Sequence, residues 1–169
     1  MKTICSIRKM QESDIKDLSQ GFINQGWPGR GEILARYFLE QECGEREVLV
    51  AEVEGALAGY ITILPIAKQG PFAEIYPELS DFNVFEPFQN QGIGNLLLEE
   101  AEKRVKLISD KVTLGVGLHS GYGPAQRLYI KRGYIPDGTG VWYRNQPLEM
   151  NATIQNNDDL VLYLSKEFE

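Results

Sequence analysis

Residues 78–95 read Glu-Leu-Ser-Asp-Phe-Asn-Val-Phe-Glu-Pro-Phe-Gln-Asn-Gln-Gly-Ile-Gly-Asn, and this stretch indicates the fold. Its first part, Leu79 to Phe85, is short and largely apolar, which is typical of a strand. A turn with Gly92 and Gly94 follows, and a helix is expected to begin near Ile93. Apolar residues recur on one face of that helix, at Ile93, Leu97, Ala101 and Val105, with Ile108 continuing the stripe. The stretch therefore predicts a strand, a turn and a helix in succession.

The turn between the strand and the helix can bind an anion through its backbone. A helix N-terminus leaves several N–H groups unpaired and pointing one way, and the helix dipole adds partial positive charge there. Such a terminus can hold a phosphate or pyrophosphate without a basic side chain. We interpret Gln89-x-x-Gly92-x-Gly94 as a candidate anion site and call Gln89–Asn95 the cradle turn. The alternative is a plain tight turn.

Two common nucleotide-binding motifs do not fit the cradle turn. The dinucleotide-binding motif needs a third glycine three residues after Gly94, where Leu97 stands. The phosphate loop of nucleotide hydrolases ends in Gly-Lys-Ser/Thr, whereas Asn95 and Leu96 follow Gly94.

Length and composition favour one soluble domain over residues 1–169. The chain is 43% hydrophobic and 24% charged, which is ordinary for a globular protein. The absence of a run of 18 apolar residues argues against a membrane span, and no secretory signal is visible. Cys5 and Cys43 are too few for a disulfide framework, so we expect two buried, reduced thiols. The cytoplasm is the expected location.

The charge balance bears on partners. A net charge of −7 opposes non-specific binding to nucleic acid or to an anionic membrane, and an acidic surface can favour a cationic substrate. No His/Cys/Asp/Glu cluster has the spacing of metal ligands, so we expect no metal.

The rest of the chain reads as a mixture of strands and helices. Strands are expected at 4–8, 47–53, 57–64, 112–118, 134–135, 141–143 and 160–164, and helices from residue 13, over 32–41 and over 124–131. This order predicts an α/β fold with a mixed sheet and helices on both faces. The strands before and after the helix from Ile93 should be parallel. If they diverge, a cleft opens beside the cradle turn.

A second motif follows in the strand and helix of residues 114–134, as Ala125-x-x-Leu128-Tyr129 and then Gly133-Tyr134. With Val84, Gln89, Gly92 and Gly94 before it, the chain resembles the GNAT superfamily of acyl-CoA-dependent N-acyltransferases. The resemblance implies a mixed, mostly antiparallel sheet with one splayed parallel strand pair and helices on both faces. There are two departures. Tyr122 stands where many members have Asn, and the turn has only neutral side chains where many members have Arg or Lys.

The resemblance also implies acetyl-CoA as the co-substrate and transfer of its acetyl group to a primary amine by direct attack. Backbone groups of Phe82, Val84 and Phe85 would pair with the pantetheine arm like an added strand. The Val84 N–H would stabilise the negative charge that develops on the carbonyl oxygen. Amides of the cradle turn would hold the pyrophosphate, namely those of Gln89, Asn90, Gln91, Gly92, Ile93, Gly94 and Asn95.

For the proton transfers, the resemblance implies Tyr129 as the general acid, because a phenol with a pKa near 10 can protonate a leaving thiolate. Packing of the ring is the alternative. Glu78 shares strand parity with Val84 and is the first candidate for the general base. Asp81 is its rival if a bulge shifts the parity. A water molecule can also serve as the base, and both carboxylates can be simply solvated.

The expected acceptor is a small-molecule amine, which the sequence does not identify. Candidate lining residues are aromatic, namely Trp27, Phe72, Tyr76, Trp142 and Tyr143. His119, the one histidine, ends a strand near the expected cleft. A homodimer is compatible with the resemblance. The alternatives in function are a non-catalytic CoA-binding or regulatory module and a pure interaction protein.

Overall fold

The computed structural model describes residues 4–169, and their contacts form two compact units. The first unit holds the chain up to Leu64 together with Leu79–Arg104, and the second holds Pro65–Glu78 and Val105–Glu169. A single domain over residues 1–169 stays a prediction, and residues 1–3 lie outside the described part.

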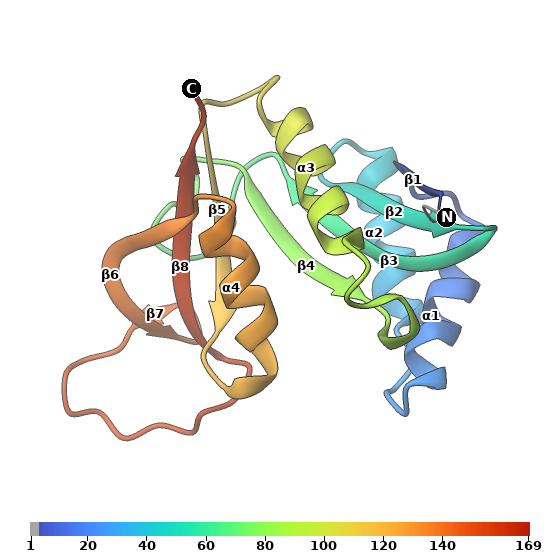
Figure 1. Cartoon of the computed structure of the whole chain (residues 1–169). Helices are drawn as coiled ribbons and strands as arrows, with labels where there is room; N and C mark the ends of the chain where they lie inside the picture. Colours follow the sequence, from blue (N-terminus) through green and yellow to red (C-terminus); the bar gives the residue numbers. More distant parts are fainter. Residues whose placement is uncertain (1–3) are drawn as a thin grey trace. The chain divides into compact units, whose positions relative to one another are not determined.

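Strands and helices alternate in the first unit. Its elements are β1 (Cys5–Lys9), α1 (Asp14–Asn24), α2 (Gly31–Glu42), β2 (Glu47–Val53), β3 (Ala56–Leu64), β4 (Glu78–Val84), the 3-10 helix η1 (Glu86–Phe88) and α3 (Ile93–Val105). β1 pairs with β2 and β2 with β3, both antiparallel, and β4 lies next to β3. Figure 1 shows α3 on one face of these strands and α2 on the other.

Alternation along β2 supplies both faces of this sheet with apolar side chains. Val48 and Val50 pack in one cluster with residues of α1 and α2, among them Leu18, Phe22, Leu34 and Tyr37. Leu49 and Ala51 point to the other face, where α3 buries Leu97, Leu98 and Ala101 completely. Each large aliphatic side chain buried in this way stabilises the fold by about 1.5–3 kcal/mol.

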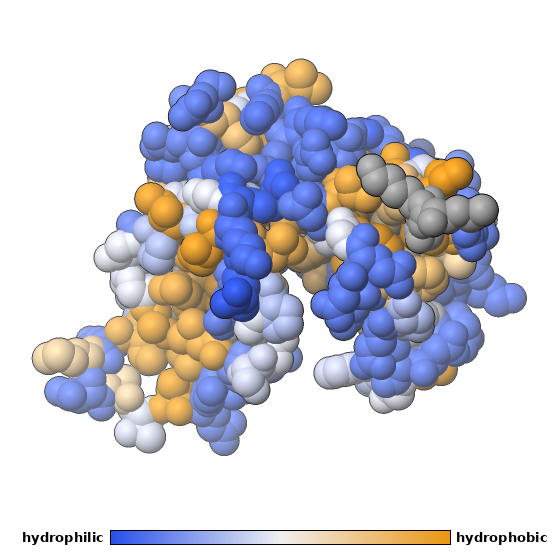
Figure 2. All heavy atoms as spheres, viewed as in Figure 1, coloured by the Kyte–Doolittle hydropathy of each residue, from blue (hydrophilic) through white to orange (hydrophobic). Residues whose placement is uncertain are grey.

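The second unit is an antiparallel sheet with one α-helix. Its elements are β5 (Lys111–Gly117), the 3-10 helix η2 (Ser120–Tyr122), α4 (Gly123–Lys131), β6 (Ile135–Tyr143), β7 (Gln146–Pro147) and β8 (Leu160–Glu167). β8 pairs with both β5 and β6, and β7 pairs with β6. In the view of Figure 2, hydrophobic side chains gather over the β6–β8 part of this unit.

The strand order across the sheet is β1-β2-β3-β4-β5-β8-β6-β7. β4 and β5 form the parallel pair, in which Glu78 lies opposite Thr113. The predicted α/β fold, with a mostly antiparallel sheet and one parallel pair, is therefore confirmed.

Several local predictions were wrong. α3 ends at Val105, whose C=O accepts from the N–H groups of Ile108 and Ser109, so Ile108 leaves the apolar stripe and is 61% exposed. β6 is one strand with an irregularity between Pro136 and Val141, where two separate strands were expected. Both cysteines are free thiols as expected, but neither is fully buried. Cys5 is partly buried, and Cys43 is exposed because it follows the last residue of α2.

Candidate functional site

The end of β4 fixes which way its backbone groups point. Phe85 N–H donates to Ala58 C=O in β3 at 2.8 Å. Because successive N–H groups of a strand point to opposite sides, the Val84 N–H faces away from β3. Of the backbone groups predicted to meet a pantetheine arm, the Phe85 N–H is therefore already bonded within the sheet. The Val84 N–H has the orientation that an added strand requires.

The cradle turn joins η1 to α3 with two residues in the left-handed conformation, Asn90 at φ +60° and Gly92 at φ +81°. Turns of this kind bring successive N–H groups into an anion-binding concavity. The Leu96 N–H donates to Gly92 C=O at 3.2 Å, so the N–H groups of Ile93 and Gly94 precede this first helical bond. A Cβ built on Gly92 meets no atom within 4 Å. The turn therefore combines a helix N-terminus with open space beside it, which suits a pyrophosphate.

The side chains of two glutamines stabilise the turn through hydrogen bonds to backbone C=O groups. Gln89 Nε2 donates to Val84 C=O at 2.9 Å, and Gln91 Nε2 donates to Pro87 C=O at 3.2 Å. The Gln89 N–H is also used, since it donates to Glu86 C=O at 3.2 Å. Gln89 and Gln91 thus set the shape of the turn with their side chains, a role that no sequence pattern had indicated.

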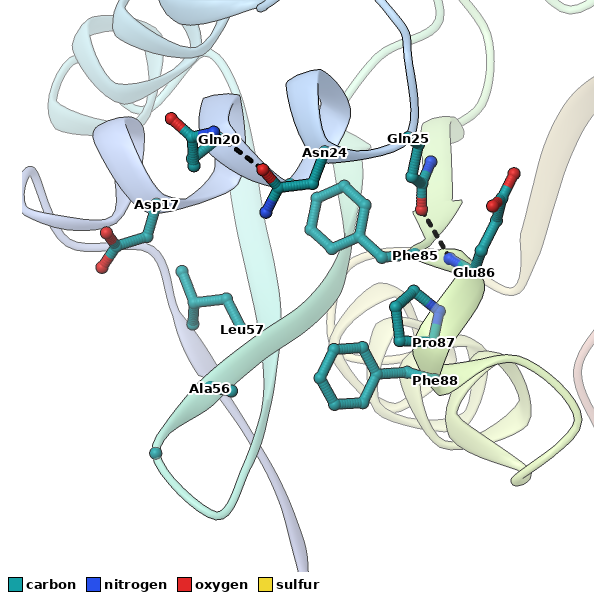
Figure 3. Close-up of a pocket in the computed structure, with 12 residues that line it drawn as sticks. Asp17, Gln20, Asn24, Gln25, Ala56, Leu57, Phe85, Glu86, Pro87 and Phe88 are labelled. Carbon is teal, nitrogen blue, oxygen red and sulfur yellow. Dashed lines mark hydrogen bonds between the residues drawn. The ribbon is translucent and has the colours of Figure 1, made fainter.

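A hollow of about 390 Å³ lies beside the segment that leads into the cradle turn (Figure 3). Leu57, Phe85 and Phe88 supply its apolar surface, and polar side chains of α1 line it too. Gln25 Oε1 accepts from the Glu86 N–H at 2.5 Å, which ties η1 to the end of α1. A Cβ on Gly21 would come within 2.5 Å of the Phe85 ring, so the glycine permits the ring to lie against α1. The hollow was not anticipated from the sequence.

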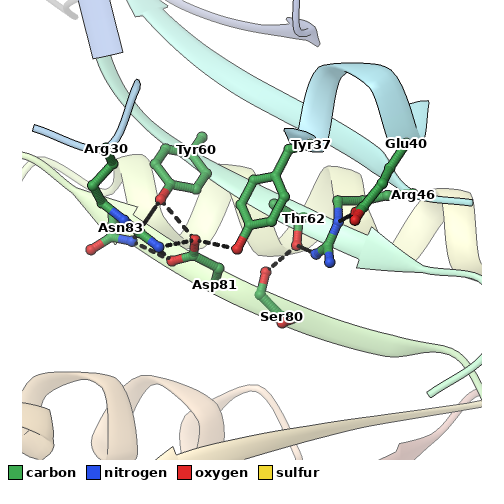
Figure 4. A network of polar contacts seen from close by, with 9 residues as sticks. All are labelled: Arg30, Tyr37, Glu40, Arg46, Tyr60, Thr62, Ser80, Asp81 and Asn83. Atoms are coloured by element: carbon green, nitrogen blue, oxygen red, sulfur yellow. Dashed lines mark hydrogen bonds and ion pairs between the residues drawn. The ribbon is translucent and has the colours of Figure 1, made fainter. Parts of the chain in front are cut away.

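Asp81 lies at the centre of a polar network in the first unit (Figure 4). Its Oδ1 accepts from Arg30 Nη1 at 3.0 Å and from Asn83 Nδ2 at 2.8 Å. Its Oδ2 accepts from the hydroxyls of Tyr37 and Tyr60, each at 2.9 Å, and pairs with Arg30 Nη2 at 2.9 Å. Because a carboxylate offers about four lone-pair sites, both oxygens of Asp81 are fully engaged.

The same network extends along α2 to β3. Arg46 donates to Glu40 Oε2 at 2.5 Å and to Thr62 Oγ1 at 2.7 Å, and its guanidinium lies 4.1 Å from the centre of the Tyr37 ring. Burial, and then the charge of Asp81, raise the pKa of Tyr37 to about 12. The same two causes raise the pKa of Tyr60. Both phenols are therefore protonated donors at neutral pH.

In the second unit, Tyr129 lies in α4 and is 6% exposed. Its ring packs against Tyr134 at 5.9 Å between centres, and its C=O accepts from the Tyr134 N–H at 3.0 Å. Burial, and then the proximity of Tyr122, raise the pKa of the Tyr129 phenol. The hydroxyl therefore keeps its proton at neutral pH, which a general acid needs, but it is a weaker acid than free tyrosine.

Tyr122, which stands where many members of the resembled family have Asn, organises the link from β5 to α4. Its ring covers Gly117, where a Cβ would come within 2.3 Å of it, and its hydroxyl donates to Asp158 Oδ1 at 3.1 Å. His119 Nε2 lies 2.8 Å from the same Asp158 oxygen, and His119 Nδ1 accepts from the Gly121 N–H. The hydrogen bonds from His119 and Tyr122 lower the pKa of Asp158 against a smaller effect of burial. His119 is thus the cap of η2, a role that no sequence pattern indicated.

Glu78 lies at the start of β4, opposite Thr113. Burial, and then the charge of Glu78, raise the pKa of Tyr163 to about 12. Among the predicted lining residues, Phe72 and Tyr76 pack together at 5.5 Å, and Trp142 packs against Tyr163 at 5.6 Å. Trp27, in the link between α1 and α2, is 61% exposed.

Two kinds of feature are absent from residues 4–169. These residues contain no group of three or more His, Cys, Asp or Glu side chains placed to hold a metal ion. No helix in this part of the chain is long and apolar enough to cross a membrane.

Solved structures share this fold at low sequence identity. An N-acetyltransferase from Staphylococcus aureus Mu50 superposes with a TM-score of 0.73 at 13% identity, over 99% of this chain and 100% of that one. The ribosomal-protein-alanine N-acetyltransferase from Brucella melitensis gives 0.70 at 21% identity, over 96% and 99%. The protein yncA from Salmonella typhimurium, described with its cofactor acetyl-CoA, gives 0.68 at 18% identity, over 98% and 94%. No curated protein sequence matches the chain.

The sequence itself matches a family model. The model describes the acetyltransferase (GNAT) family and covers residues 13–134, which include both predicted motifs from β4 to Tyr134. Members of this family use acetyl-CoA as their co-substrate, and the cradle turn, with its N–H groups and open space, fits the pyrophosphate of that molecule. Because the family model covers more than half of the chain, this chain belongs to the GNAT family of acetyltransferases, and its fold agrees with theirs.

Proposed function

We propose that this acetyltransferase moves the acetyl group of acetyl-CoA to the primary amine of a small cationic molecule. The observation that carries the proposal is the cradle turn, where left-handed Asn90 and Gly92 open the N-terminus of α3 toward free space. A backbone site of this kind holds a pyrophosphate without a basic side chain. Family membership supports the reaction class.

In this proposal, the chain holds the co-substrate with backbone groups. The N–H groups of Gly92–Asn95 hold the pyrophosphate, and backbone groups of Phe82 and Val84 pair with the pantetheine arm. The Val84 N–H, which faces away from β3, stabilises the charge that develops on the carbonyl oxygen.

Acetyl-CoA supplies an activated acetyl thioester. As the C–N bond forms and the C–S bond breaks, the amine must lose a proton and the leaving thiolate must gain one. We assign Tyr129 as the donor to the sulfur, because its phenol is protonated at neutral pH. We assign Glu78 or a water molecule as the acceptor of the amine proton. Asp81 suits that role poorly, because its oxygens already accept from Arg30, Asn83 and two tyrosines.

The acceptor class is inferred from charge. The chain carries a net charge of −7 and no run of basic residues, which favours a cationic amine over an acidic one. We also propose that the two compact units are halves of one domain, since a single family model spans parts of both.

A panel of acceptors tests the proposal. Free thiol release from acetyl-CoA is followed with polyamines, aminoglycosides, amino acids and peptides, each paired with an analogue in which a hydroxyl replaces the amine. Turnover with cationic amines and none with the hydroxyl analogues is expected. Turnover of the hydroxyl analogues alone overturns the amine assignment, and preference for acidic amines overturns the charge argument.

A further inference from the structure

Asp81 has an unusual backbone for the interior of a strand. Its φ is +52°, in the left-handed region that residues with a Cβ adopt at a cost. Aspartate tolerates this region better than most residues do, but β4 contains it in the middle of an otherwise extended segment. Such strain persists only where surrounding contacts hold it.

β4 lies next to β3, and a side-chain hydrogen bond joins the two strands at the same point. The Phe85–Ala58 hydrogen bond places Phe85 opposite Ala58, so a regular antiparallel ladder would place Asp81 opposite Thr62. Thr62 Oγ1 donates to the C=O of Ser80. From this bond and the left-handed backbone of Asp81 we infer a β-bulge at Ser80–Asp81, in which β4 accommodates one extra residue.

The contacts on Asp81 come from elements far apart in the sequence. Arg30 belongs to the link before α2, Tyr37 to α2 and Tyr60 to β3. The Tyr60 hydroxyl also accepts from Arg30 Nη1 at 2.5 Å, so the donors are bonded to one another as well. Arg30 is held in turn over the ring of Phe22, 5.3 Å from its centre. The carboxylate therefore lies in a preformed, half-buried set of donors.

We propose that Arg30, Tyr37 and Tyr60 form a clamp that holds the Asp81 bulge, and that Asp81 is thereby a positioning residue for acetyl-CoA. The inference rests on the proposed function, because it concerns the backbone assigned to the pantetheine arm. The bulge fixes the register of the residues that follow it. If β4 shifted its register by one residue, the Val84 N–H would point toward β3. The N–H of an adjacent residue would then face the pantetheine arm instead. The clamp prevents that shift.

A matched pair of substitutions separates this role from catalysis. Asp81→Gly and Asp81→Ala both remove the carboxylate, but only glycine adopts positive φ without a steric cost. The clamp account predicts that Asp81→Ala binds acetyl-CoA roughly tenfold more weakly than Asp81→Gly by calorimetry. It also predicts faster amide hydrogen exchange over Phe82–Phe85 in the alanine variant, measured without any ligand.

Glu54 supplies the control, because it has φ +50° in the exposed turn between β2 and β3. Glu54→Gly and Glu54→Ala should differ in melting temperature but bind acetyl-CoA equally. If Asp81→Ala does not fold, Tyr37→Phe replaces it, because it removes one donor and keeps the carboxylate. A severalfold loss of acetyl-CoA affinity is expected for Tyr37→Phe.

Equal affinity and equal exchange in the two Asp81 variants would overturn the clamp. An equal loss of kcat of roughly 100-fold or more in both, with affinity unchanged, would also overturn it and make Asp81 the general base. If the parent protein binds no acetyl-CoA, the proposed function fails, and the exchange rates over Phe82–Phe85 alone decide whether the clamp holds the bulge.

Discussion

Among single residues, the buried tyrosines have two kinds of proposed role, one structural and one chemical. Tyr37 and Tyr60 donate to one carboxylate and are thereby committed to the network around Asp81. Tyr129, the proposed acid, lies in the second unit, and its pKa is raised by burial. A raised pKa keeps the proton on the phenol and lowers its tendency to leave, so proton transfer depends on the thiolate being formed close by.

Replacing Tyr129 with Phe isolates the hydroxyl, because the ring and its packing against Tyr134 remain. We expect kcat to fall roughly 10²–10⁴-fold, with the affinity for acetyl-CoA nearly unchanged. Steady-state kinetics and calorimetry measure the two quantities. Tyr134→Phe is the matched control and should keep kcat, since it removes a hydroxyl from the neighbouring ring and leaves that of Tyr129 in place. An unchanged kcat in Tyr129→Phe, where chemistry limits the rate, would assign Tyr129 to packing.

At the scale of elements, the strand, turn and helix from β4 to α3 could be predicted because local rules govern them. Apolar periodicity placed the helix, and glycine marked the turn. The Asp81 network could not be predicted, because Arg30 and Asp81 are 51 residues apart and meet only through tertiary packing. The same reason applies to Asp158, which reaches His119 and Tyr122 from a distant loop.

The cradle turn offers a second matched pair. Gly92 and Gly44 have φ near +80°, and a Cβ on either meets no atom within 4 Å. Alanine should therefore cost similar stability at both positions. We expect Gly92→Ala to weaken acetyl-CoA binding about tenfold, because the methyl group occupies the space assigned to the pyrophosphate. Gly44→Ala, in the turn before β2, should bind like the parent. If calorimetry shows equal acetyl-CoA affinities for Gly92→Ala and Gly44→Ala, the cradle turn is not the anion site.

At the scale of the whole molecule, buried phenols couple stability to alkaline pH. Tyr37 and Tyr163 have pKa values raised to about 12 in the folded protein, and those of Tyr60 and Tyr129 are raised too. In the unfolded chain, phenols ionise near pH 10. Above that pH the unfolded state releases protons that the folded state retains, so stability is full below about pH 10 and is lost as pH rises toward 12 and beyond.

Urea unfolding from pH 8 to pH 11.5 measures this dependence. We expect a constant free energy of unfolding up to about pH 9.5 and a decline above it. Each buried tyrosine contributes up to about 1.4 kcal/mol per pH unit to the slope of this decline. Tyr37→Phe should lower stability at all pH values and also make the decline less steep. A parent protein whose stability is flat to pH 11.5 would contradict the assigned burial of these phenols.

The proposed function requires that the chain transfer an acetyl group from acetyl-CoA bound at the cradle turn to an amine. The most direct measurement compares free CoA thiol with N-acetylated product, identified by mass, when acetyl-CoA and the best cationic amine of the panel are mixed with the parent protein. We predict one mole of N-acetyl product for each mole of thiol, at a rate that falls when Gly92 is replaced by alanine. Tight acetyl-CoA binding with no acylated product from any acceptor would contradict this function. The chain would then be a non-catalytic CoA-binding module.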